Sequence, residues 1–414
     1  MTTGPELRAL TDTCVHCGFC LPACPTYQLW GEEMDSPRGR IHLLRQVLDG
    51  APLSGPVVGH FDACLGCLAC VPACPSGVRY DRIIEETRVM VEQSADRGAQ
   101  DRVVRAGIFA LFPYPRRMIA MRGPLRLARR LPRAVPMPAA LRTMLELAPP
   151  LRPRAALPTL LRARTGQRRA VVGLLTGCVQ SAFFSHVSAA TARVLALEGC
   201  DVVIPRGQSC CGALARHAGR DATARRQARK VVRAFEKAGV DTVVTDVAGC
   251  GSLLKEYGDL LGEAPQWTAR DVTEVLVELG PVAPRHPVPM TVAYHDACHL
   301  AHGQRVKAQP RALLAGIPEL RVVSPVDAET CCGSAGIYNL VQPVAAAELG
   351  QRKAAALVRT GADAIVAGNP GCLLQISTAL RHAQADPMPT VMHTVELLDR
   401  SLRADPPRAD PPTR

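Results

Sequence analysis

Two cysteine runs of identical spacing constrain this chain more than any other feature. CVHCGFCLPACP begins at Cys14 and CLGCLACVPACP begins at Cys64, and both follow the pattern C-x2-C-x2-C-x3-C-P. The seventeen cysteines of the chain are too clustered for a distributed disulfide framework. Its first residues lack the basic and apolar regions of a secretory signal, so we expect a cytoplasmic, reducing location. In that setting thiols hold metals or do redox chemistry more often than they crosslink.

The spacing of both runs is typical of bacterial ferredoxins, in which the fourth cysteine of each run ligates the other cluster. Three closely spaced thiolates reach three irons of one cubane, and the fourth iron needs a thiolate from elsewhere. A zinc ribbon, the alternative, uses pairs of C-x2-C rather than complete runs of four. We therefore predict two [4Fe-4S] clusters. The predicted ligands are Cys14, Cys17, Cys20 and Cys74 for one cluster, and Cys64, Cys67, Cys70 and Cys24 for the other.

The residues around the two runs predict a helical domain over residues 1–100. Gly18 and Gly66 permit the tight loops that a cluster needs. Between the runs, Ser36 can cap a helix that opens at Pro37, and residues 80–94 supply another helix. This region resembles the helical ferredoxin domain of fumarate reductase-like iron-sulfur subunits more than the small β-ribbon ferredoxins.

Residues 101–170 form a connector without cysteine. It contains sixteen arginines and ten prolines but two acidic residues, whereas the whole chain has a net charge of +12. The prolines predict short helices that wrap a surface. The arginines could meet anionic lipid, an acidic partner or solvent alone; the few aromatic residues argue against nucleic acid.

Residues 107–123 of this connector could anchor peripherally at the cytoplasmic face of a membrane. No window approaches 18 uninterrupted apolar residues, so we expect no transmembrane span.

An internal repeat begins near Ala170, and we place its two copies at 171–288 and 289–402, followed by a disordered tail at 403–414. Four cysteines recur with offsets of 120, 121, 121 and 122 residues. Each copy alternates short β-branched strands with helices, which predicts an α/β unit whose parallel sheet carries cysteines at the carboxyl ends of its strands. The recurring cysteines are Cys178, Cys210, Cys211 and Cys250 in the first copy, and Cys298, Cys331, Cys332 and Cys372 in the second.

The paired cysteines followed by glycine resemble the CCG domains of heterodisulfide reductases, anaerobic glycerol-3-phosphate dehydrogenase and glycolate oxidase. Four thiols per repeat suffice for a cluster or a tetrahedral metal ion, and an empty site stays a third alternative. The fuller family pattern has a further cysteine where this chain has Leu253 and Gln375. We therefore do not expect a five-thiolate noncubane cluster. Cys200, which has no counterpart, is expected to be a packing residue.

Several polar residues gather around Cys298, in the stretch YHDACHLAHG. His295, Asp296, His299 and His302 could tune a cluster or pass protons, although a lone histidine is more often structural. The first repeat lacks their counterparts, apart from His186, so the second repeat is the candidate for the more functional half.

Taken together, these parts resemble the glycolate oxidase iron-sulfur subunit family over nearly the whole chain. The resemblance implies an α+β multidomain fold: an N-terminal helical ferredoxin domain and two tandem α/β CCG repeats with parallel sheets. It implies an electron-transfer subunit of an oxidoreductase complex, with FAD on partner subunits that oxidise glycolate to glyoxylate and a quinone as acceptor. We find no nucleotide-binding fingerprint or nucleophile elbow, so we assign no catalytic residue to this chain.

Two alternatives stay open at this point. The chain could serve a glycerol-3-phosphate, D-lactate or other 2-hydroxyacid dehydrogenase in the same relay role. It could also be a heterodisulfide reductase-like subunit, although the missing fifth thiols count against thiol-disulfide chemistry.

Overall fold

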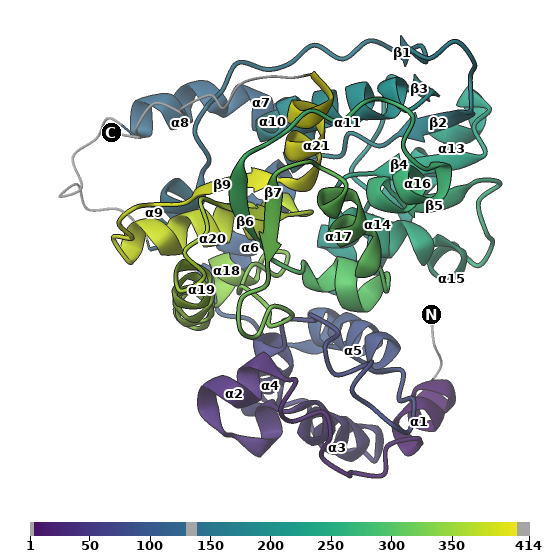
Figure 1. Cartoon of the computed structure of the whole chain (residues 1–414). Coiled ribbons are helices and arrows are strands. Elements are labelled where there is room, and N and C mark those ends of the chain that lie inside the picture. Colours follow the sequence, from purple (N-terminus) through teal and green to yellow (C-terminus); the bar gives the residue numbers. More distant parts are fainter. Residues whose placement is uncertain (1–3, 130–138, 404–414) are drawn as a thin grey trace.

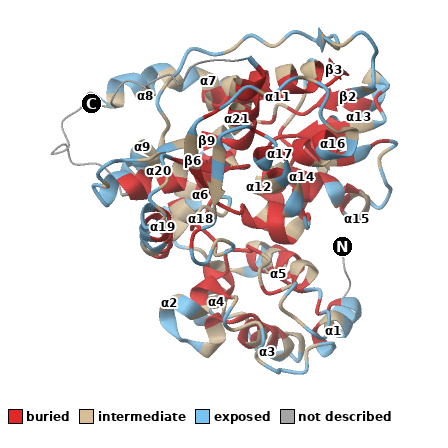
Figure 2. Ribbon diagram, in the orientation of Figure 1, coloured by how far each residue is buried: buried red, intermediate tan, exposed pale blue. Residues whose placement is uncertain are grey.

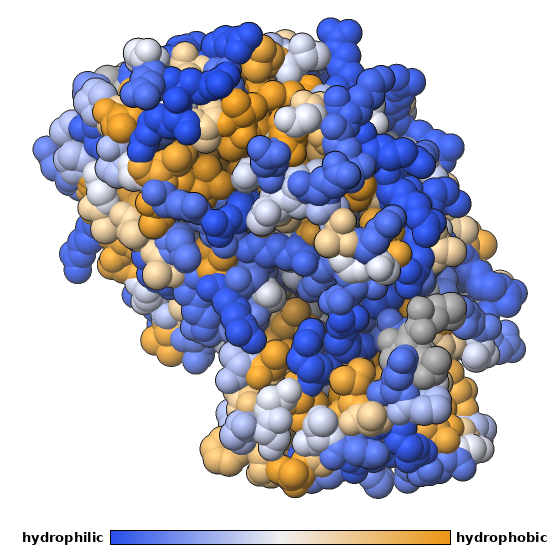
Figure 3. Space-filling model, turned by 90° about the vertical axis from the view of Figure 1, so that its right-hand side faces the viewer, coloured by the Kyte–Doolittle hydropathy of each residue, from blue (hydrophilic) through white to orange (hydrophobic). Residues whose placement is uncertain are grey.

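The computed structural model describes residues 4–129 and 139–403, in which a small helical domain lies at one end of a larger α/β body (Figure 1). The expected fold class is confirmed. Most of the predicted tail, residues 404–414, lies outside the described residues. Among the described helices, none is both long enough and apolar enough to cross a membrane. The space-filling view shows the same two lobes from another side, with the narrower helical lobe below (Figure 3).

The helical domain contains both helices that the sequence predicts. The hydroxyl of Ser36 accepts a hydrogen bond from the backbone N–H of Gly39, and the helix after it opens at Pro37. Leu44 and Ile84, from the two predicted helices, are fully buried between them. The elements are α1 (Gly4–Asp12), α2 (Pro25–Trp30), η1 (Glu33–Asp35), α3 (Pro37–Leu48), α4 (Gly55–Ala63) and α5 (Tyr80–Ser94).

The connector is more deeply packed than the sequence suggests. Ile108 and Phe109 lie in the core of the first repeat, and Met118 is buried as well. These three side chains cannot contribute to an interfacial anchor over residues 107–123, whereas Tyr114 and Met121 of the same stretch are exposed. The anchor itself stays a prediction. Helix α8 and the extended segment that leads to β1 run over the surface (Figure 2). The helices are α6 (Ala99–Leu111), α7 (Pro115–Ala120), α8 (Arg122–Ala128) and α9 (Ala139–Leu147).

The first repeat is built on a five-stranded sheet of order β1-β3-β2-β4-β5. Strands β3, β2, β4 and β5 pair in parallel, and the edge strand β1 pairs antiparallel with β3. The elements are β1 (Leu160–Leu161), β2 (Ala170–Leu174), α10 (Val179–Phe183), α11 (Ser185–Leu197), β3 (Cys200–Val203), α12 (Ala213–Arg216), α13 (Asp221–Ala238), β4 (Thr242–Thr245), α14 (Ala248–Lys255), α15 (Tyr257–Leu261), β5 (Thr268–Asp271) and α16 (Val272–Leu279).

The second repeat has an all-parallel sheet of order β7-β6-β8-β9. This order matches β3-β2-β4-β5 of the first repeat, so the recurring cysteines follow corresponding strands. The elements are β6 (Met290–Tyr294), η2 (His299–Gly303), α17 (Ala308–Ala315), β7 (Leu320–Val323), α18 (Tyr338–Val341), α19 (Pro343–Val358), β8 (Ala364–Ala367), α20 (Pro370–His382), β9 (Thr390–His393) and α21 (Thr394–Arg403).

Candidate functional site

The two cysteine runs of the helical domain fold into matching loops. The backbone N–H of Cys24 donates to the carbonyl of Leu21 at 3.1 Å, and that of Cys74 donates to Val71 at 3.2 Å, fifty residues later. An arginine side chain also donates to a backbone carbonyl in each loop. Arg38 donates to the carbonyl of His16 and Arg88 to that of Cys64. The equal spacing of the two runs therefore produces two equal backbone shapes.

Each loop has two residues in the left-handed region of backbone conformation. In the first loop these are His16 (φ 54°) and Gly18 (φ 88°), and in the second they are Gly66 (φ 66°) and Leu68 (φ 63°). The two predicted glycines thus occupy different places in the loops. Each loop has one glycine where a side chain is disfavoured and one residue that adopts this conformation despite its side chain.

Cys24 lies among the thiols of the second run. Together with Cys64, Cys67 and Cys70 it lines one small cavity. All four cysteines are buried. This geometry supports the crossed assignment, in which the last cysteine of the first run completes the set of the second.

Hydrogen-bond donors and positive charge surround this buried set. The hydroxyl of Tyr80 donates to Cys64 Sγ at 3.7 Å, and the backbone N–H of Gly66 donates to the same sulfur at 3.4 Å. Arg40, 1% exposed, forms an ion pair with Asp35 beside the cavity. Such donors and charges set the reduction potential of an iron-sulfur centre.

The electrostatics of these thiols fit a site that gains a metal cluster. Burial raises the pKa of the Cys67 and Cys70 thiols well above the ordinary value. Burial alone would also raise the pKa of Cys64, but the charges of Arg40 and Arg88 lower it overall. Coordination by a metal deprotonates a thiol outright, so four buried thiols around one cavity suit a [4Fe-4S] cluster.

The other set is closer to the surface. Cys14, Cys20 and Cys74 are partly buried and pack against the same apolar cluster, whereas Cys17 is exposed. Burial raises the pKa of the Cys20 thiol to about 11. The helical domain therefore offers one outer and one inner set of four cysteines.

In the first repeat, the four recurring thiols form a chain of neighbours. Cys178 contacts Cys210, which contacts Cys211, and Cys211 Sγ lies 3.1 Å from Cys250 Sγ. The pKa of the Cys178 thiol is raised well above its ordinary value, mainly by the contact with Cys210 and also by burial. The sequence repeat therefore corresponds to one cluster of thiols at the carboxyl edge of the sheet.

The second repeat gathers its thiols in the same way, with Cys298 next to Cys331 and Cys332 next to Cys372. A histidine joins them. His295 lies with Cys332 and Cys372 in a group whose ligand atoms are all within 4.8 Å of one another.

The inner set of the helical domain adjoins the second repeat. Cys67 packs in one apolar cluster with Cys298, Cys331 and Tyr338. Three sets of thiols therefore follow one another: the outer set, the inner set and the set of the second repeat.

Where a fifth cysteine is missing, the structure has core residues. Leu253 is 1% exposed and packs against the apolar core of the first repeat. Gln375 is also buried; its amide donates to the carbonyl of Ala346 and accepts from Asn339. Cys200 is fully buried and pairs with Ala170 at the amino ends of β3 and β2, whereas the recurring thiols follow the carboxyl ends of the strands.

The other polar residues near Cys298 have separate roles. Asp296 forms a bidentate ion pair with Arg311, with N···O distances of 2.6 and 2.7 Å. The ring of His299 lies 4.9 Å from that of His217 in the first repeat. His302 faces the backbone carbonyl of Glu329 at 3.4 Å.

Sequence reasoning missed two buried cations beside the thiols, Arg40 and Lys353. Both stand on amphipathic helices, where a basic residue is ordinarily solvated. The only available signal is their register: each falls on the apolar face of its helix.

Three family models match the chain. The 4Fe-4S dicluster domain matches residues 11–78, and the cysteine-rich domain named CCG matches residues 172–255 and 292–377. The linker region of the glycolate oxidase iron-sulfur subunit matches residues 100–152.

Two curated proteins are similar over nearly their whole length. The probable glycolate oxidase iron-sulfur subunit of Bacillus subtilis (strain 168) is 37% identical, covering 96% of this chain and 98% of that protein. The glycolate oxidase iron-sulfur subunit of Escherichia coli (strain K12) is 32% identical, covering 97% and 96%. The chain belongs to the glycolate oxidase iron-sulfur subunit family. This confirms the family resemblance that the cysteine motifs indicate.

More distant similarities cover parts of the chain or the fold alone. One subunit of the fumarate reductase (CoM/CoB) of Methanothermobacter marburgensis is 35% identical over 56% of this chain and 47% of that protein. A crystal structure of a hypothetical protein from Helicobacter pylori aligns with a TM-score of 0.55 at 9% identity, over 89% of this chain and 68% of that one.

Proposed function

We propose that this chain is the electron-transfer subunit of a glycolate oxidase complex. It takes electrons from glycolate oxidation on FAD-containing partner subunits and passes them toward a quinone. The observation that carries the proposal is the position of Cys24 among Cys64, Cys67 and Cys70. Crossed ligation of this kind brings two clusters close together, as stepwise electron transfer requires.

The exposure of the two sets suggests the direction of the relay. The outer set includes the exposed Cys17, flanked by Val15 and Phe19, which are 68% and 66% exposed. Apolar side chains at such exposure suit a protein interface. We place the electron-donating partner at this loop, so that electrons pass from the outer set to the inner one.

The inner set would receive electrons inside the protein. Tyr80 and Arg40 provide a hydrogen bond and a positive charge, both of which favour the reduced, more negative state of a nearby cluster. The next thiols along the route are Cys298 and Cys331. The second repeat is therefore the part of the chain through which electrons would leave the helical domain.

A quinone acceptor requires the complex to approach a membrane. The arginines of the connector are the candidate contact, since Ile108, Phe109 and Met118 of that segment are buried. We accordingly place the chain in the cytoplasm, with peripheral contact at the membrane.

The proposal is tested by anaerobic purification of the chain with its co-purifying partners. Two cubanes require about eight irons per chain, visible by iron and sulfide analysis and by EPR. Glycolate should reduce the EPR signals faster than D-lactate or glycerol-3-phosphate does. Reduction by either of the other substrates in preference to glycolate would reassign the donor, and an iron-free preparation would refute the relay.

Single substitutions test the crossed ligation. Cys24→Ala and Cys70→Ala should weaken the same EPR signal, and Cys74→Ala should weaken the other one together with Cys17→Ala. Cys200→Ala is the matched control, since this buried thiol lies apart from both sets and should leave the iron content unchanged. If Cys24→Ala and Cys20→Ala weaken the same signal, each run holds its own cluster.

A further inference from the structure

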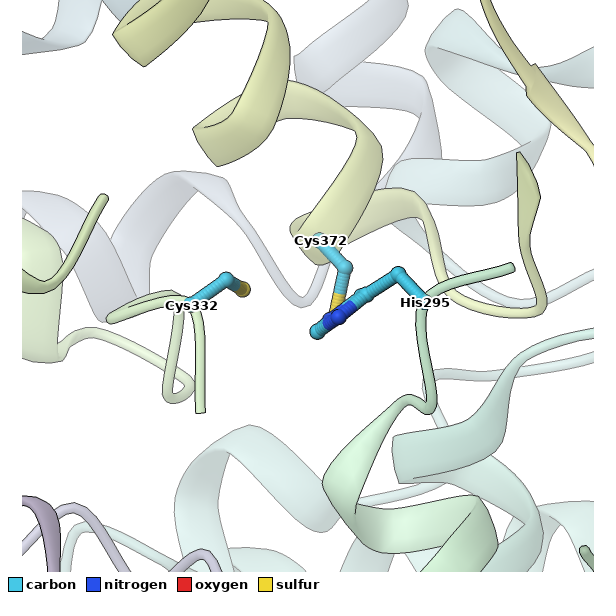
Figure 4. A group of neighbouring side chains, drawn as sticks. All are labelled: His295, Cys332 and Cys372. Atoms are coloured by element: carbon cyan, nitrogen blue, oxygen red, sulfur yellow. The ribbon is translucent and has the colours of Figure 1, made fainter. Parts of the chain in front are cut away.

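Three side chains converge in the interior of the second repeat (Figure 4). His295 follows β6, Cys332 lies between β7 and α18, and Cys372 is in the first turn of α20. The exposed fractions of these residues are 1%, 1% and 3%. Their ligand atoms all lie within 4.8 Å of one another, and no second group of this kind occurs in residues 4–129 and 139–403.

His295 has no protein partner for its ring. Within the described part of the chain, neither Nδ1 nor Nε2 makes a hydrogen bond, although both are buried. Leaving a buried polar group unsatisfied costs about 1–3 kcal/mol, so native structures usually supply a partner. A metal ion between the imidazole and the two thiols would be such a partner.

The first repeat provides an internal reference. Counting back from the first recurring cysteine of each repeat, His295 corresponds to Leu175. The glycines after the paired cysteines pack against Ala224 and Ala346. Seven residues beyond these alanines stand Val231 and Lys353.

Both first-repeat residues, Leu175 and Val231, lie in one apolar cluster with Cys210 and Cys211. The second repeat has therefore replaced two buried apolar side chains beside its thiols by an imidazole and an ammonium group.

The charges near the second set suit thiolates. Lys353 is 3% exposed and donates to the backbone carbonyls of Asp327 and Ala328. Because these acceptors are uncharged, the two hydrogen bonds do not neutralise its ammonium group. Cys372 lies at the N-terminal end of a thirteen-residue helix and accepts a hydrogen bond from Asn369 at 3.4 Å. A helix N-terminus stabilises a thiolate.

We propose that the second repeat binds a single metal ion of the zinc class through His295, Cys332 and Cys372. Zinc bonds of about 2.3 Å to sulfur and about 2.0–2.1 Å to nitrogen bring tetrahedral ligands within about 4 Å of each other, which the observed group can reach with small shifts. Cys331 contacts Cys332 and is the candidate fourth ligand. A zinc ion with three thiolates and a neutral imidazole has one net negative charge, which Lys353 offsets.

The group is more compact than a cubane requires, because a cubane distributes its four thiolates over four irons. Zinc does not change its oxidation state, so electrons that leave the inner set beside Cys298 and Cys331 would pass the zinc site without reducing it.

The test is metal analysis of the full chain, purified anaerobically with its clusters. We expect about one zinc per chain in addition to the iron, with a mixed nitrogen and sulfur shell in X-ray absorption at the zinc edge. His295→Leu, which installs the first-repeat residue, should remove the nitrogen scatterer and speed zinc loss to a chelator at least tenfold. The cluster EPR signals should stay unchanged, which shows that the variant is folded.

The matched controls are Cys250→Ala in the first repeat and His299→Leu beside the second. Both should retain zinc, whereas Cys372→Ala should lose it. A zinc content near zero in the unmodified chain would overturn the proposal. So would about twelve irons per chain with iron, rather than zinc, lost in His295→Leu, because the site would then hold a cluster.

Discussion

The two repeats share a strand order but differ in the buried side chains around their thiols. In both, four thiols gather at the carboxyl edge of a parallel sheet. In the first repeat they are packed with Leu175 and Val231, and in the second the corresponding positions hold His295 and Lys353. A duplicated fold can therefore keep its backbone while two substitutions change an apolar thiol cluster into one suited to a charged ligand.

The two repeats also contact the helical domain through different kinds of interaction. The first repeat contacts it through ion pairs. The guanidinium nitrogens of Arg216 lie 3.0 Å from a carboxylate oxygen of Glu85 and 2.9 Å from one of Glu86, both on α5. The second repeat is joined by apolar packing of Cys67 against Cys298 and Cys331. We infer that the first repeat fixes the position of the helical domain. The second repeat provides the contact to the inner set of cysteines in that domain.

The strongest test of this difference is Arg216→Met. The substitution leaves Glu85, Glu86 and Asp221 without their buried cation, and loss of one partner from such a network costs about 3–5 kcal/mol. Urea denaturation of the anaerobically purified protein measures the free energy of unfolding. Arg82→Met is the control, because its ion pair with Asp259 is solvent-exposed and contributes at most about 1 kcal/mol. Equal effects of the two variants would contradict an anchoring role for the first repeat.

Acid should remove part of the same contact. Burial alone would raise the pKa of Glu85, but the hydrogen bond with His217 and the charge of Arg216 lower it to about 2. A lowered carboxyl pKa stabilises the folded state above the unfolded value, about 4.5, and this stabilisation is lost as the pH falls from about 4.5 toward 2.

The measurement is the difference in unfolding free energy between the unmodified chain and Glu85→Gln. Cluster loss in acid affects both proteins and cancels in the comparison. The difference should shrink below pH 4.5, and a constant difference would show that Glu85 is not charged in the folded state.

A smaller effect is expected from Lys353→Met. The carbonyls of Asp327 and Ala328 lose their donor, which costs about 1–3 kcal/mol. The metal should also bind less tightly, since the offsetting charge is gone. Calorimetric unfolding and zinc retention check both parts. Lys307→Met is the control, because its solvent-exposed ion pair with Glu329 contributes at most about 1 kcal/mol.

Much of the site could be predicted from residues near each other in the sequence. The spacing of Cys14 to Pro25 determines a loop shape whatever surrounds it, and the same spacing recurs fifty residues later. The helices opening at Pro37 and Tyr80 follow from local patterns. Burial of Ile108 and of Arg40 could not be predicted in this way. Their environments are made by segments far along the chain, and an apolar or basic residue on a short helix suits the surface as well as the interior.

The sequence by itself determined which chemistry the chain can hold, because thiol spacing and strand-end positions are local properties that the backbone preserves. Only the tertiary structure decided which thiols meet. The crossing of Cys24 into the second set, the packing of Cys67 against Cys298 and the convergence of His295 on Cys372 depend on long-range packing of helices and sheets. That packing is a balance of many small burial free energies, which no single stretch of sequence contains.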